Sequence, residues 1–183
     1  MYNEFAMKVE KICPNPGYIL DIGCGIGHDL KYFHERGWRV YGIDKNAKNI
    51  EKIRTSYGVN SALVGDILQL PFPNDFFNAV YCRNVLHYLK SEEIPVAISE
   101  SRRVSKKEAY LFFMFFSIKD KVRHGNTLFI SEQEVDEYFS NCTLIEKAEV
   151  LVAESHNEMG LHVHTFWQVI GKKEGCATSY NTV

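Results

Sequence analysis

The chain has 183 residues, of which 45% are hydrophobic and 24% are charged, and this composition excludes a disordered, collagen-like or low-complexity polypeptide. Its 21 basic and 23 acidic side chains leave a net charge of -2, which disfavours bulk nucleic-acid binding because no basic field covers the whole molecule. The length fits one domain, which we expect over residues 1–173, followed by a tail over residues 174–183.

Three features of the chain bear on its compartment. The longest apolar run, residues 109–116, is far shorter than the ~20 residues that span a bilayer. The first ten residues are mixed and charged, unlike a secretion signal. The five cysteines are odd in number and form no C-x-x-C pair, which favours reduced thiols over a disulfide framework. We therefore expect a cytoplasmic protein that does not enter a membrane.

Predicted strands and helices alternate along most of the chain. Hydrophobic spacing, caps and turn residues predict helices over residues 3–12, 28–36, 46–57, 91–104 and 131–138, and strands over residues 18–22, 38–43, 61–64, 76–82 and 110–116. Two further predicted strands, residues 143–153 and 163–171, have no helix between them and should pair antiparallel at a sheet edge. This order predicts an α/β fold with a single doubly wound, Rossmann-like sheet, mostly parallel with an antiparallel C-terminal edge strand.

Acidic residues follow three successive strands of this sheet, at the edge where such folds bind ligands. Asp21 precedes a glycine turn at residues 23–27, where it would repel a pyrophosphate but suit an amine. His28 also stands where a dinucleotide fingerprint needs a small residue. Asp44 suits the hydroxyls of a ribose, and Asp66 suits an exocyclic amine. Together the three carboxylates suit an amino-acid moiety, a ribose and an adenine without a phosphate, which describes S-adenosylmethionine.

Four motifs in this order carry a family resemblance. They are YILDIGCGIGHDLKYF from Tyr18, VYGID ending at Asp44, GDILQLPF from Gly65 and FNAVYCRNVLHYL from Phe77. Over residues 18–117, with weaker support to residue 172, the chain resembles the class I S-adenosylmethionine-dependent methyltransferases of the compact bacterial type that act on small molecules. The resemblance implies S-adenosylmethionine as cofactor and S-adenosylhomocysteine as product.

The resemblance also implies a role for each matching residue. The cofactor-binding residues would be Asp21, Gly23, Cys24 and Gly25 at the methionine part, Asp44 and Lys45 at the ribose, Asp66 and Ile67 at the adenine, and Cys82 and Arg83 at the amino-acid end. His87 and Tyr88 would face the reactive methyl or the substrate, and these two are the catalytic candidates. Cys24 and Cys82 also suit small buried hydrophobic positions, and His87 also suits a packing role.

Two positions depart from the family pattern. Asn78 replaces the usual acid of the fourth-strand motif, where the residue packs or caps rather than reacts. Ser105-Lys-Lys-Glu108 replaces the usual Pro-Gly-Gly turn, so the chain must turn there by other means. Asp29 remains open between a cofactor contact and a helix cap.

The acceptor of the methyl group is open. A small molecule is the first hypothesis, with no membrane partner and nucleic acid disfavoured, and the oligomeric state is not readable from the sequence. One alternative is an RNA methyltransferase similar to the transfer-RNA wobble-uridine enzymes, and another is a non-catalytic S-adenosylmethionine-binding module. A basic track for RNA would use Arg102, Arg103, Lys106, Lys119, Lys121 and Arg123.

A general base is needed only for an acceptor that is protonated at neutral pH. The candidate bases are His87, His156, His162 and His164. His162 and His164 share one strand face, where we expect a polar surface and no metal. Residues 117–128 form either a mobile lid or an exposed connection, and a lid is favoured.

Overall fold

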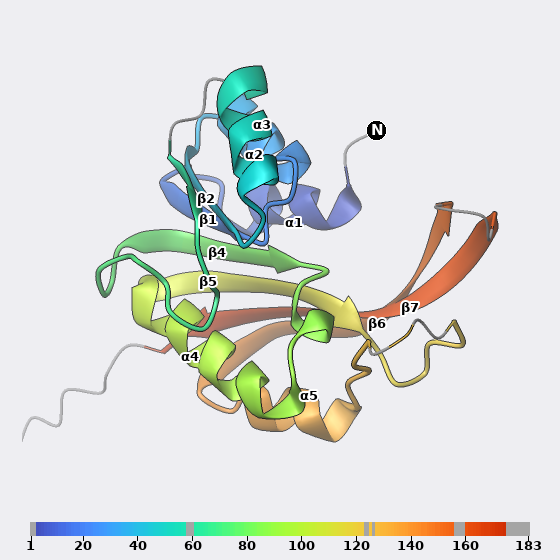
Figure 1. Cartoon of the computed structure of the whole chain (residues 1–183). Coiled ribbons are helices and arrows are strands. Elements are labelled where there is room, and N and C mark those ends of the chain that lie inside the picture. The colour runs from blue at the N-terminus through green and yellow to red at the C-terminus, as the bar shows by residue number, and fades with distance from the viewer. Residues whose placement is uncertain (1–2, 58–60, 123–124, 126, 156–159, 175–183) are drawn as a thin grey trace, which may run out of the picture.

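A mixed β-sheet organises the molecule (Figure 1). The structure is a computed structural model that describes residues 3–57, 61–122, 125, 127–155 and 160–174. Within them, the strands are β1 (Tyr18–Ile22), β2 (Arg39–Asp44), β3 (Ala62–Val64), β4 (Phe77–Arg83), β5 (Ser105–Phe116), β6 (Cys142–Ser155) and β7 (Leu161–Lys173). The sheet order is β3-β2-β1-β4-β5-β7-β6, with β1 to β5 parallel and β7 antiparallel to both its neighbours. The predicted mixed sheet is confirmed, with β6 as its edge and the last strand, β7, inside it.

Helices cover both faces of the sheet (Figure 1). One face carries α1 (Glu4–Ile12), α2 (His28–Glu35) and α3 (Ala47–Tyr57), and the other carries α4 (Ile94–Val104) and α5 (Glu132–Tyr138). Two short 3-10 turns, η1 (Leu86–Tyr88) and η2 (Ser91–Glu93), connect β4 to α4. Ser91, predicted as the cap of one continuous helix, therefore lies inside a separate turn, where Glu93 accepts from the backbone N–H of Lys90 at 2.8 Å.

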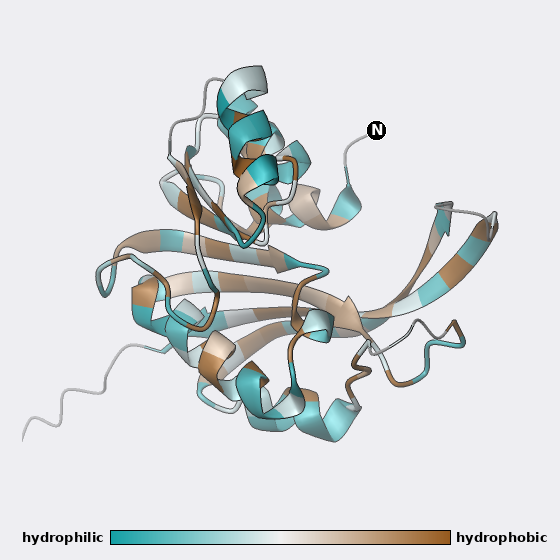
Figure 2. Ribbon diagram, in the orientation of Figure 1, coloured by the Kyte–Doolittle hydropathy of each residue, from teal (hydrophilic) through white to brown (hydrophobic). Residues whose placement is uncertain are grey.

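The buried face of each element follows from its hydrophobic period. In β5, alternate residues enter different cores: Phe113 and Phe115 pack with α4 and α5, whereas Phe112 and Met114 pack with α1 and α2. Figure 2 shows the resulting pattern, with hydrophobic strands between helices whose outward surfaces are hydrophilic. A strand covered on both faces in this way is typical of the centre of a parallel sheet.

The junction between α4 and β5 replaces the turn expected at residues 105–108. The strand begins at Ser105 directly after the helix, and the β4–β5 register shifts between Phe77 and Ala79. Glu108 has a left-handed φ of 64° at this shift in the strand pairing. Asn78 lies at this same edge, where its Oδ1 accepts from Tyr18 N–H and from Lys106 Nζ, both at 3.0 Å.

Strands β6 and β7 are longer than predicted and extend past the carboxyl end of β5 (Figure 1). We refer to residues 151–155 and 161–165 as the β6–β7 arm. The segment after β5 is fixed to this arm by Asp120, a buried carboxylate that accepts from Thr165 N–H at 2.9 Å and from Val122 N–H at 2.7 Å. The part of the predicted lid at residues 123–124 and 126 lies outside the described residues, as does the tail from residue 175. Among the helices that are described, none is long and apolar enough to cross a membrane.

Candidate functional site

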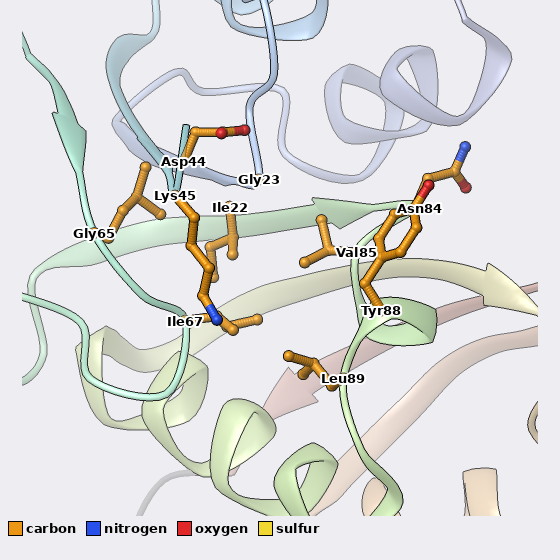
Figure 3. A pocket seen from close by; sticks show the side chains of 11 residues that line it. Ile22, Gly23, Asp44, Lys45, Gly65, Ile67, Asn84, Val85, Tyr88 and Leu89 are labelled. Atoms are coloured by element: carbon orange, nitrogen blue, oxygen red, sulfur yellow. The ribbon is translucent and has the colours of Figure 1, made fainter. Parts of the chain in front are cut away.

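A cavity of about 260 Å³ lies at the carboxyl ends of β1, β2 and β3, at the sheet edge that the sequence predicts (Figure 3). We refer to it as the first cavity. Its lining comes from four separate segments of the chain. These residues are Ile22, Gly23, Ile43, Asp44, Lys45, Gly65, Ile67, Asn84, Val85, Tyr88 and Leu89.

The glycine turn after β1 forms one wall of the first cavity. Gly23 N–H and Cys24 N–H both donate to Ile43 O, at 2.7 and 3.1 Å, so the turn is bound to the end of β2. Gly23 has a φ of 67°, and a Cβ at this position would lie 2.2 Å from Cγ2 of Val85. At Gly25, with a φ of 51°, a Cβ would meet nothing within 4 Å. The turn therefore needs glycine for its conformation, and at Gly25 it leaves space open for a ligand.

Asp44 joins this turn to the end of β2. Its Oδ2 accepts from Gly25 N–H at 2.8 Å, and its Oδ1 accepts from Asn46 N–H at 2.8 Å and from Asn49 Nδ2 at 3.2 Å. An ionised carboxylate has about four acceptor sites, so one further donor can still bind. The side chain is thus held in place by protein groups and retains capacity for a ligand hydroxyl.

The segment after β3 supplies the apolar end of the first cavity. Ile67 lines it with only 5% of its surface exposed. The Asp66 side chain is half-exposed and lies outside the lining, with its Oδ1 accepting from Leu68 N–H at 3.0 Å. Lys45 Nζ lies 3.2 Å from Asp66 Oδ2. Lys45 and Asp66 therefore form an ion pair beside the cavity.

Asp21 is a buried carboxylate with an unsatisfied oxygen. Only 4% of its surface is exposed, and its Oδ2 has no hydrogen-bond partner among the described residues. Burial raises the pKa of Asp21 well above its usual range, the charges of Asp29 and Asp44 raise it further, and Arg83 lowers it. A buried carboxylate oxygen of this kind favours a cationic donor, because pairing offsets the cost of its burial.

Arg83 and Asp29 belong to a polar cluster on the α1 side of the sheet. Arg83 Nε donates to Asp29 Oδ2 at 2.8 Å, while Asn3 Nδ2 donates to Asp29 Oδ1 at 3.0 Å and to Tyr81 OH at 2.8 Å. Asp29 therefore holds these side chains together and does not cap its helix, whose N-cap is Gly27. The side chain of Arg83 points away from the first cavity and is absent from its lining.

The two cysteines of the predicted site do not line the first cavity. Cys24 and Cys82 are both buried, and burial raises the pKa of each thiol. Cys24 packs against Gly42, where an added Cβ would lie 2.9 Å from the Cys24 Sγ. Both side chains occupy the small hydrophobic positions that the sequence also allowed, and all four described cysteines are free thiols.

The two catalytic candidates occupy different positions. Tyr88 is 78% exposed and lines the first cavity, whereas His87 is 2% exposed and does not. The His87 ring lies 4.4 Å from the Phe116 ring, between centroids. His87 O also accepts from Leu128 N–H at 3.0 Å. The structure therefore places Tyr88 at the cavity and His87 behind it, packed against the end of β5.

The histidine pair of β7 lies in the β6–β7 arm. His164 is fully buried and its Nδ1 donates to Asp120 Oδ2 at 2.9 Å. The Nε2 atoms of His162 and His164 lie 3.0 Å apart, so they form a chain of hydrogen bonds from the buried carboxylate. No group of three or more metal-ligating side chains is present in the part of the chain that the structure describes. His124 and His156 lie outside that part.

The model of a methyltransferase domain family matches residues 20–113, slightly more than half of the chain. The chain belongs to this methyltransferase family. Its members use S-adenosylmethionine as methyl donor, as the four ordered motifs imply. Among the solved structures with a similar fold, TehB from Haemophilus influenzae has a TM-score of 0.81 at 19% identity, covering 94% of this chain and 63% of that chain.

Two further relatives carry more specific names. Malonyl-[acyl-carrier protein] O-methyltransferase of Serratia marcescens is 29% identical over 100 residues, which are 54% of this chain and 38% of that protein. The chain therefore spans less than half the length of that methyltransferase. The solved 1,6-didemethyltoxoflavin-N1-methyltransferase of Burkholderia thailandensis, which holds S-adenosylhomocysteine, has a TM-score of 0.74 at 17% identity, covering 94% of this chain and 78% of that chain.

The residues present fit the cofactor of the methyltransferase family. A buried oxygen of Asp21 is unsatisfied, Gly25 leaves open space, and Asp44 retains capacity for another hydrogen bond. The sequence analysis gave no binding role to Asn84. This residue lines the first cavity with a left-handed φ of 59° and a buried Oδ1 that has no partner among the described residues. Asn84 could have been identified from its position, because it directly follows a buried strand at the ligand edge and asparagine tolerates a positive φ.

Proposed function

We propose that this protein transfers a methyl group from S-adenosylmethionine to a nucleophilic atom of a small-molecule acceptor. The observation that carries the proposal is the buried, unsatisfied Asp21 oxygen, which precedes a glycine turn that is bound to the Asp44 carboxylate in the lining of the first cavity. Asp21 supplies a partner for an amine, and Asp44 supplies a partner for a ribose. Among the lining residues that the structure describes, Lys45 is the one basic side chain, and its pairing with Asp66 leaves no free cation for a phosphate.

Each predicted binding residue receives a role in this proposal. Asp21 would hold the amino group and Asp44 the ribose hydroxyls, while Ile67 would cover the adenine and Asp66 would accept from its exocyclic amine. Gly23 and Gly25 provide the open turn, and Lys45 fixes the position of Asp66. Cys24 and Cys82 would contribute backbone and packing, and the backbone at Arg83 would lie near the amino-acid end.

When bound, the cofactor supplies a methyl group on a sulfonium, which is already a strong electrophile. The chain's own residues then need mainly to position the nucleophile and exclude water. Tyr88 lies in the lining of the first cavity, where its exposed ring is placed to cover it. Asn84 is in the same lining and carries a buried oxygen with no partner among the described residues. His87 supports Tyr88 through ring contact at 4.4 Å between centroids.

The glycine turn provides a test of this assignment. Gly23→Ala should lower affinity for S-adenosylhomocysteine at least tenfold, because the new Cβ would displace Val85 from the wall of the first cavity. Gly37→Ala is the matched control, since Gly37 also has a positive φ, 83°, but its Cβ would meet nothing within 4 Å. Both variants should lose about 1–2 kcal/mol of unfolding free energy from backbone strain. Equal calorimetric affinity in the two variants would exclude the turn from the binding site.

The RNA alternative is weakened by where its basic residues lie. Arg103 is bound to Glu100 at 2.7 Å, and its terminal nitrogens donate to backbone carbonyl groups at 2.8 and 2.9 Å. Lys119 is bound to Glu149 at 2.6 Å. One basic group lies at the start of β5 and consists of Arg102, Arg103 and Lys106. The other group follows the strand and consists of Lys119 and Lys121. The 12 residues of the strand therefore separate the two groups by roughly 35 Å. These side chains do not form one continuous phosphate track.

A labelling experiment decides between the three hypotheses. The protein is incubated with methyl-labelled S-adenosylmethionine and fractionated cell extract, and we expect label in the small-molecule fraction. Transfer to RNA would replace the proposal with the first alternative. Cofactor binding without transfer to any fraction would support the non-catalytic module instead.

A further inference from the structure

A second cavity, of about 480 Å³, lies on the α1 face of the sheet and shares no lining residue with the first cavity. Its floor is a row of three residues from neighbouring strands: Arg83 on β4 pairs with Met114 on β5, which pairs with Gln168 on β7. The first turns of α1 form one wall, and residues 150–154 of β6 form the other. A cavity of this size is in the range that binds small molecules.

Consecutive residues at the carboxyl end of β4 line the two cavities. Arg83 lines the second cavity, and the next residue, Asn84, lines the first. Asn84 N–H donates to Met114 O at 2.9 Å, so the residue between the cavities is tied to the floor of the second. A ligand that contacts Arg83 or Met114 in the second cavity would therefore touch a residue that is bonded to Asn84 in the lining of the first.

Gln168 gives the second cavity a specific polar requirement. The side chain is 6% exposed, and its buried Oε1 has no hydrogen-bond partner among the described residues. Its Nε2 makes only a long contact of 3.9 Å to Met114 Sδ. An unsatisfied buried carbonyl oxygen is costly, so a ligand that donates an N–H or O–H would be favoured over one that does not.

The charges around the second cavity favour an uncharged ligand. The two cations in its lining are both bound to carboxylates: Lys8 forms an ion pair with Glu146, and Arg83 with Asp29. Glu4 and Glu154 add negative charge at the wall. An anionic ligand would meet no uncompensated cation among the lining residues that the structure describes.

Apolar side chains complete the lining. Phe5 and Met114 are 1% and 4% exposed, and Val150 and Val152 lie opposite α1 on β6. A ligand would thus bury an apolar part against these residues while a polar hydrogen points to Gln168.

We propose that the second cavity binds the methyl acceptor, and that this acceptor is an uncharged, partly apolar small molecule that donates an N–H or O–H to Gln168 Oε1. The inference rests on the proposed methyl transfer and adds the acceptor's location and chemical class. Gln168 is then a specificity-determining residue of the acceptor site.

The test uses matched probes and the protein saturated with S-adenosylhomocysteine. 2-Naphthol and indole donate one hydrogen bond, 2-methoxynaphthalene and 1-methylindole donate none, and 2-naphthoate carries a negative charge. Ligand-observed NMR should show that the two donors bind at least several-fold more tightly than their methylated counterparts and than 2-naphthoate. Preferred binding of 2-naphthoate, or equal binding of donors and methylated counterparts, would overturn the proposal.

Variants then locate the binding. Gln168→Met, which keeps the side-chain size, should weaken the donors about tenfold and leave the methylated probes unchanged. Gln133→Met in α5 is the control and should change nothing. Val150→Trp should fill the cavity and abolish all probe binding. If the probes bind Gln168→Met and Val150→Trp as tightly as the wild type, the inference is wrong.

Calorimetry with S-adenosylhomocysteine tests cofactor binding separately from the proposed acceptor site. Unchanged affinity in Gln168→Met and Val150→Trp would show that both variants fold and keep the first cavity. If the wild type does not bind S-adenosylhomocysteine, the proposed function fails; if it binds and the probes do not respond to Gln168, only the acceptor assignment fails.

Discussion

Asp44→Ala should lower affinity for S-adenosylhomocysteine by roughly 5- to 150-fold, corresponding to about 1–3 kcal/mol for the lost hydrogen bonds. The carboxylate would bind the ribose hydroxyls directly, and it also fixes the glycine turn through Gly25 N–H at 2.8 Å. The substitution therefore removes one ligand contact and loosens the wall that forms the others. Isothermal titration calorimetry measures the change.

Two further variants interpret that result. Asp44→Asn keeps one oxygen acceptor and should give an intermediate affinity. That oxygen can accept either from Gly25 N–H or from a ribose hydroxyl, whereas the carboxylate can accept from both. Asp136→Ala removes an acid of α5 that pairs with Lys147 at 2.7 Å and does not line the first cavity, so it should leave affinity unchanged. If Asp44→Ala folds and binds as tightly as Asp136→Ala, the ribose assignment is wrong.

Asp21→Asn should have opposite effects on stability and on binding. Burial disfavours the charged form of this carboxylate, so a neutral amide should raise the unfolding free energy of the ligand-free protein at pH 7 by about 1–3 kcal/mol. The same change removes the partner of the cofactor's amino group and should weaken S-adenosylhomocysteine binding by roughly 10- to 150-fold. Urea unfolding and calorimetry measure the two effects on the same sample.

The pH dependence of unfolding gives the sign of the Asp21 effect. Burial raises the pKa of Asp21 in the folded protein, so the folded state holds this proton more tightly than the unfolded state does. The wild type should therefore lose stability as pH rises above the ordinary carboxyl range near ~4 and toward the raised folded pKa, whereas Asp21→Asn lacks that loss. Asp136→Asn, at an exposed acid, should follow the wild type. If the wild type has a higher unfolding free energy in urea at pH 7 than Asp21→Asn, the Asp21 carboxylate does not destabilise the fold and this prediction is wrong.

The sequence predicted the sheet and the ligand edge because those depend on local patterns. Glycines 23 and 25, together with Asp44, are recognisable from their places after short apolar strands. The structure places Gly23 and Asp44 in the lining of one cavity, and it binds Gly25 N–H to the Asp44 carboxylate. The length of β5 was not predictable in the same way. Its first residues are polar, and they continue the strand only because pairing with β4 shifts register at residue 77.

Side-chain direction was the main limit on predicting the site. Arg83 and Asn84 are neighbours in one motif, yet they line different cavities because β4 ends at Arg83 and Asn84 turns the chain with a left-handed φ of 59°. Gln168 had no local signal, since its role depends on the row that it forms with Met114 and Arg83 across three strands. Asp120 and His164 are separated by 44 residues and meet only through the β6–β7 arm.

A crystal structure of the protein with S-adenosylhomocysteine tests the central claim most directly. The account predicts the ligand in the first cavity, with its amino group at the Asp21 carboxylate, its ribose hydroxyls at Asp44 and its adenine against Ile67. A ligand bound elsewhere, or one in this cavity whose ribose does not contact Asp44, would contradict it.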